Sequence, residues 1–300
     1  MRRALLAAAM LLAACNAPAG GGPALTGAPP SLVPQSLPAF FDCLRESNAV
    51  LVSAHRGGPQ RGYAENAIPT FEHTLLRAPA FLEVDVAATS DGELVLMHDE
   101  TVDRTTDGEG EVDQLTLDEF QALRLRDETG AVLDVAPPTL SEALDWARTR
   151  AVLELDVKRG VSYEDVLQAV RRARALDRVI FVTYSPIGAA RIARLAPAAM
   201  IYVTIDNVRD LDTLERRGAD LSRLVAWLGA DGVNTALLEA LNARGVEVRV
   251  GDFTRNPNYI GLARAGVEGV AVDDPAVAYR AFDAADNAEG YAALQCASAE

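Results

Sequence analysis

The stretch AVLELDVK at residues 151–158 alternates apolar and polar side chains, as a half-buried β-strand does. FLEVDVAA at residues 81–88 has the same form, and six further short β-branched runs occur along the chain. Segments with apolar residues at three- and four-residue spacing separate these runs, as expected of amphipathic helices. Eight strands alternating with helices over about 250 residues predict a closed parallel (β/α)8 TIM barrel. The predicted strands are residues 49–54, 81–88, 151–158, 179–185, 200–206, 231–235, 246–252 and 266–274.

The main alternative to a barrel is an open, doubly wound sheet. The dinucleotide-binding form of that sheet carries G-x-G-x-x-G after its first strand, whereas HRGG occupies residues 55–58 here. Residues 89–140 interrupt the alternation, with a hairpin expected through Asp91-Gly92 and a strand ELVLMHD at residues 93–99. Because long loops in compact domains are usually functional, we expect this insertion to form a small lid or subdomain near the barrel mouth.

Residues 1–15 have the pattern of a processing signal, with a basic start and a short apolar run. The run ends in Leu-Ala-Ala-Cys, which resembles a bacterial lipobox. We therefore expect export to the cell envelope and attachment to a membrane through a lipid on Cys15, with simple secretion as the alternative. Residues 16–38 are rich in Pro, Gly and Ala and are expected to form a flexible linker. Residues 39–300 would form the barrel domain.

The charge balance limits the partners of this chain. It carries 28 Lys and Arg against 43 Asp and Glu, a formal net charge of −15. Such an acidic protein has no general attraction for nucleic acid, so no nucleic-acid partner is expected. An anionic small-molecule substrate would also be repelled at long range. Its site would therefore need local positive charge from a metal ion or an arginine.

Two cysteines remain after Cys15, namely Cys43 and Cys296. Cys43 lies just before the first predicted strand, and Cys296 follows the last predicted helix. A closed barrel brings its first and last strands together, and an exported chain can keep disulfides. We therefore expect a Cys43–Cys296 disulfide, with two free thiols on mobile ends as the alternative.

The chain contains only three histidines. His55 closes the first predicted strand and His98 closes the hairpin strand, which in a barrel are the positions that carry catalytic side chains. Histidine titrates near neutral pH, so the two can act as an acid and a base in one turnover. His73 lies inside a predicted helix and is expected to be structural.

Two predicted strands carry charged side chains at every second position. Glu83 and Asp85 share one face of the second strand, and Glu154, Asp156 and Lys158 share one face of the third. Because the opposite faces are apolar and pack on helices, these groups point into the barrel. Several inward carboxylates would repel one another unless a cation lies among them, and oxygen ligands favour Ca2+ or Mg2+. The alternative is an internal salt-bridge network that uses the barrel's own lysine and arginine, Lys158 and Arg56.

The order of these residues resembles the glycerophosphodiester phosphodiesterase family. That family carries H-R-G, P-E-N-T, E-x-D, T-x-D-G, H-D, R-T-T-x-G and P-T-L-x-E in this order. The resemblance covers about residues 50–278, nearly the whole expected barrel. The matching segments here are HRGG (55–58), AENA (64–67), EVD (83–85), TSDG (89–92), HD (98–99), RTTDG (104–108) and PTLSE (138–142).

The resemblance implies an exported, metal-dependent phosphodiesterase that converts a glycerophosphodiester to glycerol 3-phosphate and an alcohol. One alternative is a lysophospholipase D-like enzyme on the same barrel, which a membrane anchor would favour. Another is a non-catalytic, lipid-anchored binding protein. The family's roles would fall on His55 and His98 for acid–base catalysis, Arg56, Asn66 and Lys158 for substrate binding, and Glu83, Asp85 and Asp156 for Ca2+ or Mg2+.

Several positions depart from the family pattern. Asp156 stands where the family has a longer Glu, and Glu154 is expected to compensate by entering the coordination shell. Ala64 and Ala67 replace the Pro and Thr of P-E-N-T, which would loosen the turn between them. Arg249 stands near the place of the family's Trp-Thr, which would remove an aromatic wall and add a cation.

Overall fold

A computed structural model describes residues 31–230, 233–286 and 292–298. The expected signal segment 1–15, with Cys15, and most of the expected linker lie outside these residues. Within the described part of the chain, no helix is both long and apolar enough to cross a bilayer.

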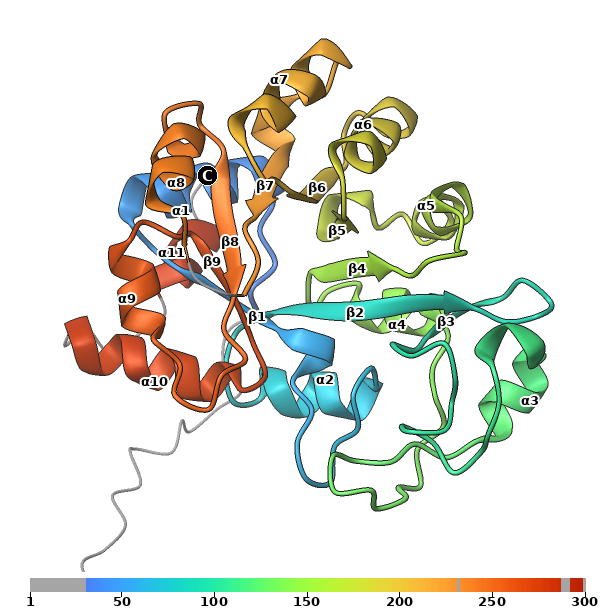
Figure 1. The fold of residues 1–300 in the computed structure, drawn as a ribbon. Coiled ribbons are helices and arrows are strands. Elements are labelled where there is room, and N and C mark those ends of the chain that lie inside the picture. Colours follow the sequence, from blue (N-terminus) through green and yellow to red (C-terminus); the bar gives the residue numbers. More distant parts are fainter. Residues whose placement is uncertain (1–30, 231–232, 287–291, 299–300) are drawn as a thin grey trace, which may run out of the picture.

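The described chain alternates strands and helices along most of its length (Figure 1). The strands are β1 (Leu51–Ala54), β2 (Phe81–Ala88), β3 (Leu94–Leu96), β4 (Leu153–Val157), β5 (Val179–Thr183), β6 (Met200–Thr204), β7 (Leu224–Trp227), β8 (Glu247–Gly251) and β9 (Gly269–Val272). The helices are α1 (Leu37–Ser47), α2 (Ile68–Leu75), α3 (Leu117–Ala122), α4 (Leu140–Ala147), α5 (Tyr163–Arg172), α6 (Pro186–Leu195), α7 (Val208–Arg216), α8 (Thr235–Asn242), α9 (Tyr259–Arg264), α10 (Pro275–Asp286) and α11 (Ala292–Ala297).

The sheet is a closed parallel barrel, as the alternation predicts. Its order is β1-β9-β8-β7-β6-β5-β4-β2, and a parallel β1–β2 pairing closes the ring. Helices surround the barrel (Figure 1). Apolar side chains of the strands and helices form the core between them. The open doubly wound alternative is therefore wrong.

The insertion after β2 forms a small subdomain beside the barrel. Its strand β3 pairs antiparallel with β2, which confirms the expected hairpin. Its apolar side chains, including Val95, Val102 and Phe120, form a cluster of their own. The side chain of Thr116 caps α3 by accepting a hydrogen bond from the backbone N–H of Glu119, whose carboxylate accepts one from the backbone N–H of Thr116 in return.

One predicted strand is wrong. The described residues of 231–235 lie in a loop and at the start of α8, where Asn234 caps the helix by accepting a hydrogen bond from the N–H of Leu237. The strand at this place in the barrel is β7, four residues of which only Trp227 is not fully buried. A short apolar run of this kind lacks the alternation that identifies a strand.

The helix α1 closes the N-terminal end of the barrel. Phe40, Phe41 and Leu44 pack against residues at the starts of the strands, such as Phe81 and Met200. Leu32 and Leu37, which fall within the expected linker 16–38, are buried in the same cluster. The packed body thus begins before residue 39.

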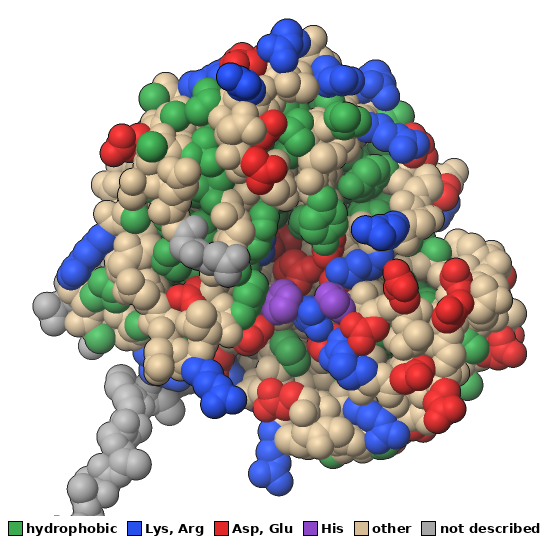
Figure 2. All heavy atoms as spheres, in the orientation of Figure 1, with side chains coloured by type: hydrophobic (Ala, Val, Ile, Leu, Met, Phe, Trp, Pro, Cys, Tyr) green, Lys and Arg blue, Asp and Glu red, His purple; other side chains and the backbone are tan. Residues whose placement is uncertain are grey.

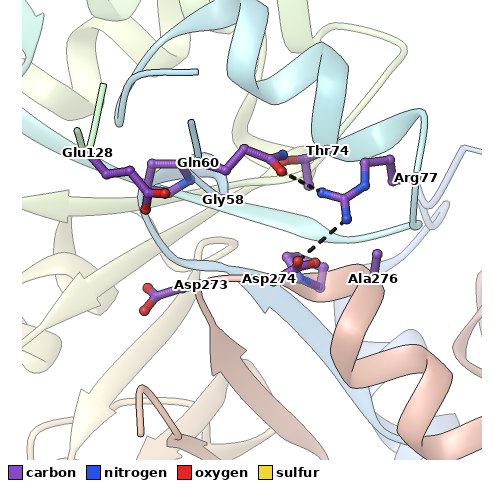
Figure 3. A pocket seen from close by; sticks show the side chains of 10 residues that line it. Gly58, Gln60, Thr74, Arg77, Glu128, Asp273, Asp274 and Ala276 are labelled. Carbon is purple, nitrogen blue, oxygen red and sulfur yellow. Dashed lines mark hydrogen bonds and ion pairs between the residues drawn. The ribbon is translucent and has the colours of Figure 1, made fainter. Parts of the chain in front are cut away.

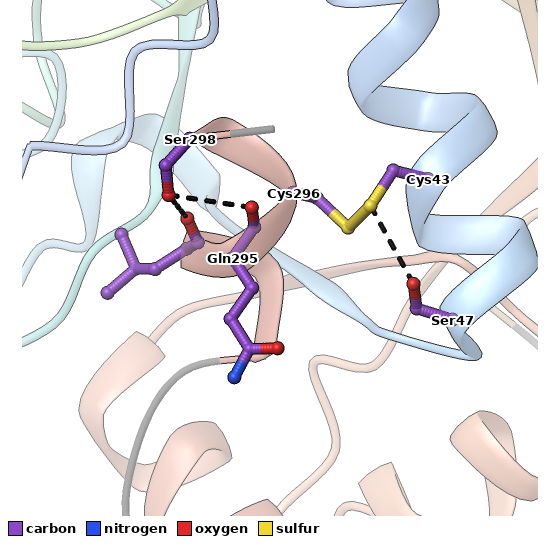
Figure 4. Close-up of a disulfide and its surroundings, with 6 residues drawn as sticks. Cys43, Ser47, Gln295, Cys296 and Ser298 are labelled. Carbon is purple, nitrogen blue, oxygen red and sulfur yellow. Dashed lines mark hydrogen bonds between the residues drawn. A yellow bond between two sulfur atoms is a disulfide. The ribbon is translucent and has the colours of Figure 1, made fainter. Parts of the chain in front are cut away.

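A disulfide joins α1 to α11, with Cys43 and Cys296 Cα atoms 5.5 Å apart (Figure 4). It confirms the expected pairing, and it closes a loop with a sequence separation of 253 residues. The bond therefore links α1, at the N-terminal end of the barrel, to α11, the last helix of the described chain.

Reduction of this disulfide is expected to lower the free energy of unfolding by up to about 5 kcal/mol, because it releases a long loop in the unfolded chain. Urea unfolding with and without reductant measures the loss. The double variant Cys43→Ser/Cys296→Ser should match the reduced protein and should not respond to reductant. Two free thiols in unreduced, denatured protein that lacks Cys15 would contradict the pairing.

Candidate active site

The carboxyl ends of the barrel strands surround a hollow in the molecular surface. Figure 2 shows histidine side chains at its edge and acidic side chains deeper within it. His55 begins the turn His55–Gly57 after β1, and His98 follows β3. The fold therefore brings together two histidines that are 43 positions apart in the sequence (98 − 55 = 43).

Each of the two histidines has a carboxylate beside its Nδ1 atom. His55 Nδ1 lies 2.9 Å from Asp273 Oδ1, and His98 Nδ1 lies 2.6 Å from Asp99 Oδ1. A carboxylate at Nδ1 favours the tautomer with the proton on that nitrogen, which leaves Nε2 as an acceptor. Neither Nε2 has a hydrogen-bond partner among the described residues, so both are available to a ligand.

The third histidine lies elsewhere. His73 is in α2, and its ring stacks on Tyr63 with 3.8 Å between the centroids. Burial, together with the nearby charge of Arg77, lowers the pKa of His73. This environment agrees with the structural role expected for His73.

The turn after β1 has a backbone that few residues adopt. Arg56 has φ 50° and Gly57 has φ 81°. A Cβ atom on Gly57 would lie 2.3 Å from the ring of Phe71, so only glycine fits there. The turn directs the backbone N–H of Arg56 to Glu83 Oε2, at 2.7 Å. The H-R-G sequence thus fixes one of the expected metal ligands through the main chain.

Three carboxylates converge at the bottom of the hollow. Asp85 of β2 is paired in register with Asp156 of the neighbouring β4. Together with Glu83 they offer ligand atoms that all lie within 4.8 Å of one another. Asp85 is 1% exposed and the other two are each 7% exposed, so little water screens their mutual repulsion.

The pKa values in this cluster reflect burial and one lysine. Burial, followed by the charge of Asp85, raises the pKa of Glu83 well above its ordinary value. Burial also acts to raise the pKa of Asp85, but Lys158 and the Asn66 amide outweigh it and hold that pKa below its ordinary value. Lys158 Nζ lies 2.6 Å from both Asp85 and Asp156. A single ammonium group, that of Lys158, therefore partly neutralises the charges of both Asp85 and Asp156.

These contacts test the salt-bridge alternative. Lys158 binds two of the carboxylates, as that alternative predicts, while among the described residues Glu83 receives only the backbone N–H of Arg56. Arg56 Nε is 3.8 Å from Asp85 and has no hydrogen-bond acceptor within the described chain. Lys158 and the more distant Arg56 are thus the two cations beside three buried carboxylates, and hard oxygen donors of this kind fit Ca2+ or Mg2+.

Asn66, which is expected to bind substrate, contacts the acidic cluster through Asp85. Its side-chain N–H group donates to Asp85 Oδ2 at 2.7 Å, and its carbonyl accepts the backbone N–H of Asp85 at 3.0 Å. Its own backbone N–H donates to the carbonyl of Arg56, and its φ is 57°. The turn between Ala64 and Ala67 therefore holds Asn66 in place without the Pro and Thr of the family pattern.

The expectation that Glu154 joins the metal ligands is wrong. Glu154 is fully buried in a separate network below the cluster, where it accepts hydrogen bonds from Ser53, Tyr202 and Arg249. The Arg249 guanidinium lies 5.1 Å from the ring centroid of Trp227 and makes its ion pair with Glu154. Arg249 is therefore not a spare cation for substrate.

The expected loss of an aromatic wall from the pocket is also wrong. Phe253, which follows β8, lies with its ring centroid 4.5 Å from that of His55. A Cβ atom on Gly251 would meet both Phe253 and Trp227 within 3 Å, which shows how closely these rings approach that backbone. The aromatic wall beside His55 is thus formed by residues other than those at the family's Trp-Thr position.

The insertion supplies a chain of ion pairs that no periodic pattern in the sequence indicates. Arg104 donates to both oxygens of Asp99, at 2.6 and 3.0 Å, and to both oxygens of Glu65, each at 2.8 Å. Glu65 also accepts from Arg56 Nη1. The chain links His98 to Arg56 through alternating charges. The only sequence signal was the position of Arg104 at the start of RTTDG.

A cavity of about 220 Å3 lies next to this site and includes Asp273, the partner of His55, in its lining (Figure 3). It is lined by polar residues that include Gln60, Asp273 and Asp274, and it does not lie over the acidic cluster. Arg77 donates to Gln60 at 3.0 Å and to Asp274 at 3.4 Å across one side of it. Asp273 is the residue that the cavity shares with the His55 pair.

A histidine pair beside buried carboxylates, at the carboxyl ends of the strands of a TIM barrel, fits the class of metal-assisted phosphodiesterases. The chain belongs to the glycerophosphoryl diester phosphodiesterase family, whose sequence profile matches residues 55–277. It is an enzyme of that class, a glycerophosphodiester phosphodiesterase.

Individual relatives agree with this assignment. A glycerophosphodiester phosphodiesterase of Caldanaerobacter subterraneus is 29% identical over 234 residues, which cover 75% of this chain and 94% of the relative. The crystal structure of a glycerophosphoryl diester phosphodiesterase from Parabacteroides distasonis has a TM-score of 0.79 at 28% identity and covers 85% of this chain and 94% of that one. An Oleispira antarctica phosphodiesterase, solved with the product sn-glycerol-3-phosphate, shares the fold with a TM-score of 0.65 at 21% identity, over 80% of this chain and 99% of that one.

Proposed function

We propose that the chain hydrolyses a glycerophosphodiester to glycerol 3-phosphate and an alcohol, with a divalent metal ion held by Glu83, Asp85 and Asp156. The observation that supports this most is the pair His55 and His98, each fixed by a carboxylate at Nδ1, beside the buried acidic cluster. The product bound to the Oleispira antarctica phosphodiesterase supports the same substrate class. Ca2+ and Mg2+ both suit the oxygen donors.

The cationic side chains would bind the phosphate. Arg56 Nε lacks an acceptor within the described chain, and a guanidinium can donate two parallel hydrogen bonds to phosphate oxygens. Lys158 lies beside Asp85 and Asp156, so its ammonium can contact the same phosphate. A bound metal ion would neutralise the phosphate and the charge that develops on its oxygens. The positive charge of these groups would offset the long-range repulsion between an acidic protein and its anionic substrate.

The two histidines would move the protons. One Nε2 would accept a proton from the attacking group, either water or a hydroxyl group of the substrate, and the other histidine, protonated, would donate a proton to the oxygen of the leaving alcohol. Attack by water gives glycerol 3-phosphate directly, whereas attack by the substrate hydroxyl group gives a cyclic phosphate that water then opens. Asp99 and Asp273 would hold the rings in orientation and stabilise each imidazolium as it forms. Asn66, bound to Asp85 on both its amide atoms, would keep that carboxylate in place during the reaction.

We also propose that the enzyme is exported and anchored to a membrane through Cys15. The Cys43–Cys296 disulfide supports export, because such bonds persist in oxidising compartments. Metabolic labelling with a radioactive fatty acid tests the anchor, and Cys15→Ser is the control. Equal labelling of the Cys15→Ser variant would contradict it.

A substrate panel tests the proposed reaction. Purified enzyme lacking residues 1–30 is assayed with several glycerophosphodiesters and lysophospholipids, each with Ca2+, Mg2+ or chelator. We expect a higher kcat/KM for glycerophosphodiesters, and activity only with metal. A preference for lysophospholipids would favour the lysophospholipase D-like alternative, and no turnover of either class would favour the binding protein.

A further inference from the structure

Tyr184 makes an unusual contact for a residue at the surface. It follows β5 directly, and its hydroxyl group donates to both oxygens of Asp156, at 2.5 and 2.6 Å. Yet 61% of the residue is exposed, so its ring contributes little to the core. The contact therefore depends on the hydroxyl group, which a phenylalanine would lack.

The other two carboxylates of the cluster each have a neutral donor that fixes them. Glu83 receives the backbone N–H of Arg56, and Asp85 receives the side-chain amide of Asn66. For Asp156 the neutral donor is Tyr184. The remaining contact of Asp156 is with Lys158, which is shared with Asp85 and is part of the proposed phosphate site.

Asp156 depends on such a donor more than a glutamate at the same position would. It stands one methylene short of a glutamate, so its carboxylate has less reach toward Glu83 and Asp85. A hydrogen bond from a group outside the cluster restricts the rotation of the Asp156 side chain and so fixes the direction of its carboxylate. One oxygen can keep this bond while the other faces the ion.

We propose that Tyr184 is a positioning residue of the metal site, whose hydroxyl group holds Asp156 ready for the ion. The inference rests on the proposed metal site at Glu83, Asp85 and Asp156. It assigns a role to a side chain that otherwise stands exposed at the rim of the hollow, and it ties Tyr184 to the short ligand found in this chain.

The test is calorimetric titration of metal-free enzyme with Ca2+ and with Mg2+. Tyr184→Phe is expected to weaken metal binding about 10- to 100-fold, the usual effect of losing a hydrogen bond to a metal ligand. Tyr163→Phe is the matched control. Burial and then the charge of Asp156 raise the pKa of Tyr163, but its hydroxyl group makes no hydrogen bond to Asp156 in the described structure. Its affinity for metal should stay at the wild-type value.

A second variant distinguishes positioning from general damage. In the Tyr184→Phe background, Asp156→Glu adds the missing methylene and is expected to recover part of the lost affinity. Circular dichroism and melting check that each variant folds, which the exposure of Tyr184 favours. Unchanged or tighter binding by Tyr184→Phe, with wild-type enzyme that binds metal, would overturn the inference alone. A folded wild-type enzyme that binds neither ion would overturn the metal site together with it.

Discussion

Alanine in place of His55 or His98 is expected to lower kcat by about 10²- to 10⁴-fold, the usual contribution of a general acid or base. Both rings lie at the edge of the hollow with Nε2 unpaired in the described structure, so each can reach the substrate. Neither belongs to the buried core, since the side chains are 28% and 34% exposed. The melting temperature of each variant should therefore stay close to that of the wild type.

His73→Ala is the matched control for both variants. The ring of His73 stacks on Tyr63 away from the acidic cluster, so its loss should leave kcat near the wild-type value. Steady-state assays of the three variants with one glycerophosphodiester make the comparison. An inactive His73 variant beside an active His98 variant would mean that the site is placed wrongly.

Removal of the metal ion is expected to abolish activity and to lower the melting temperature. Without a cation, Glu83, Asp85 and Asp156 repel one another in a buried place where Lys158 alone is in contact with two of them. A ligand at a hundred times its Kd stabilises a protein by about 2.7 kcal/mol, or about 5–10 °C for a domain of this size. Chelation followed by return of Ca2+ or Mg2+, monitored by melting and by turnover, measures both effects.

The variant Asp85→Asn provides the control for metal removal. It should melt at a temperature that neither chelator nor added metal changes, because the most buried ligand has lost its charge. Full activity of wild-type enzyme that is verified to be metal-free would contradict the metal site. Arg56 and Lys158 would then be the cations left to bind the phosphate.

The convergence of the acidic residues could be predicted because strand periodicity decides which face a side chain occupies. Glu83 and Asp85 point inward on β2, and the parallel register with β4 brings Asp156 beside Asp85. Strand periodicity does not show, however, how far along the barrel axis an inward-pointing side chain lies. Glu154 points inward like Asp156, yet it lies two residues nearer the N-terminal end of β4 and bonds to Ser53 and Arg249.

Contacts between loops could not be predicted from the sequence. Arg104 and Glu65 are 39 positions apart and lie on different loops, so no periodic pattern connects them. The same holds for Tyr184 and Asp156, because the side chain of Tyr184, just after β5, reaches Asp156 on the neighbouring β4 only in the folded sheet. Strand β7 was missed for a different reason, since four buried residues carry no alternation.

The most direct test of the account is a phosphorus-31 NMR time course of one glycerophosphodiester with wild-type enzyme and with His55→Ala/His98→Ala. We expect wild-type enzyme with Ca2+ or Mg2+ to convert the diester signal to that of glycerol 3-phosphate. The diester should persist with chelator or with the double variant. Conversion by the folded double variant at the wild-type rate, or an unchanged diester with metal-loaded wild-type enzyme, would contradict it.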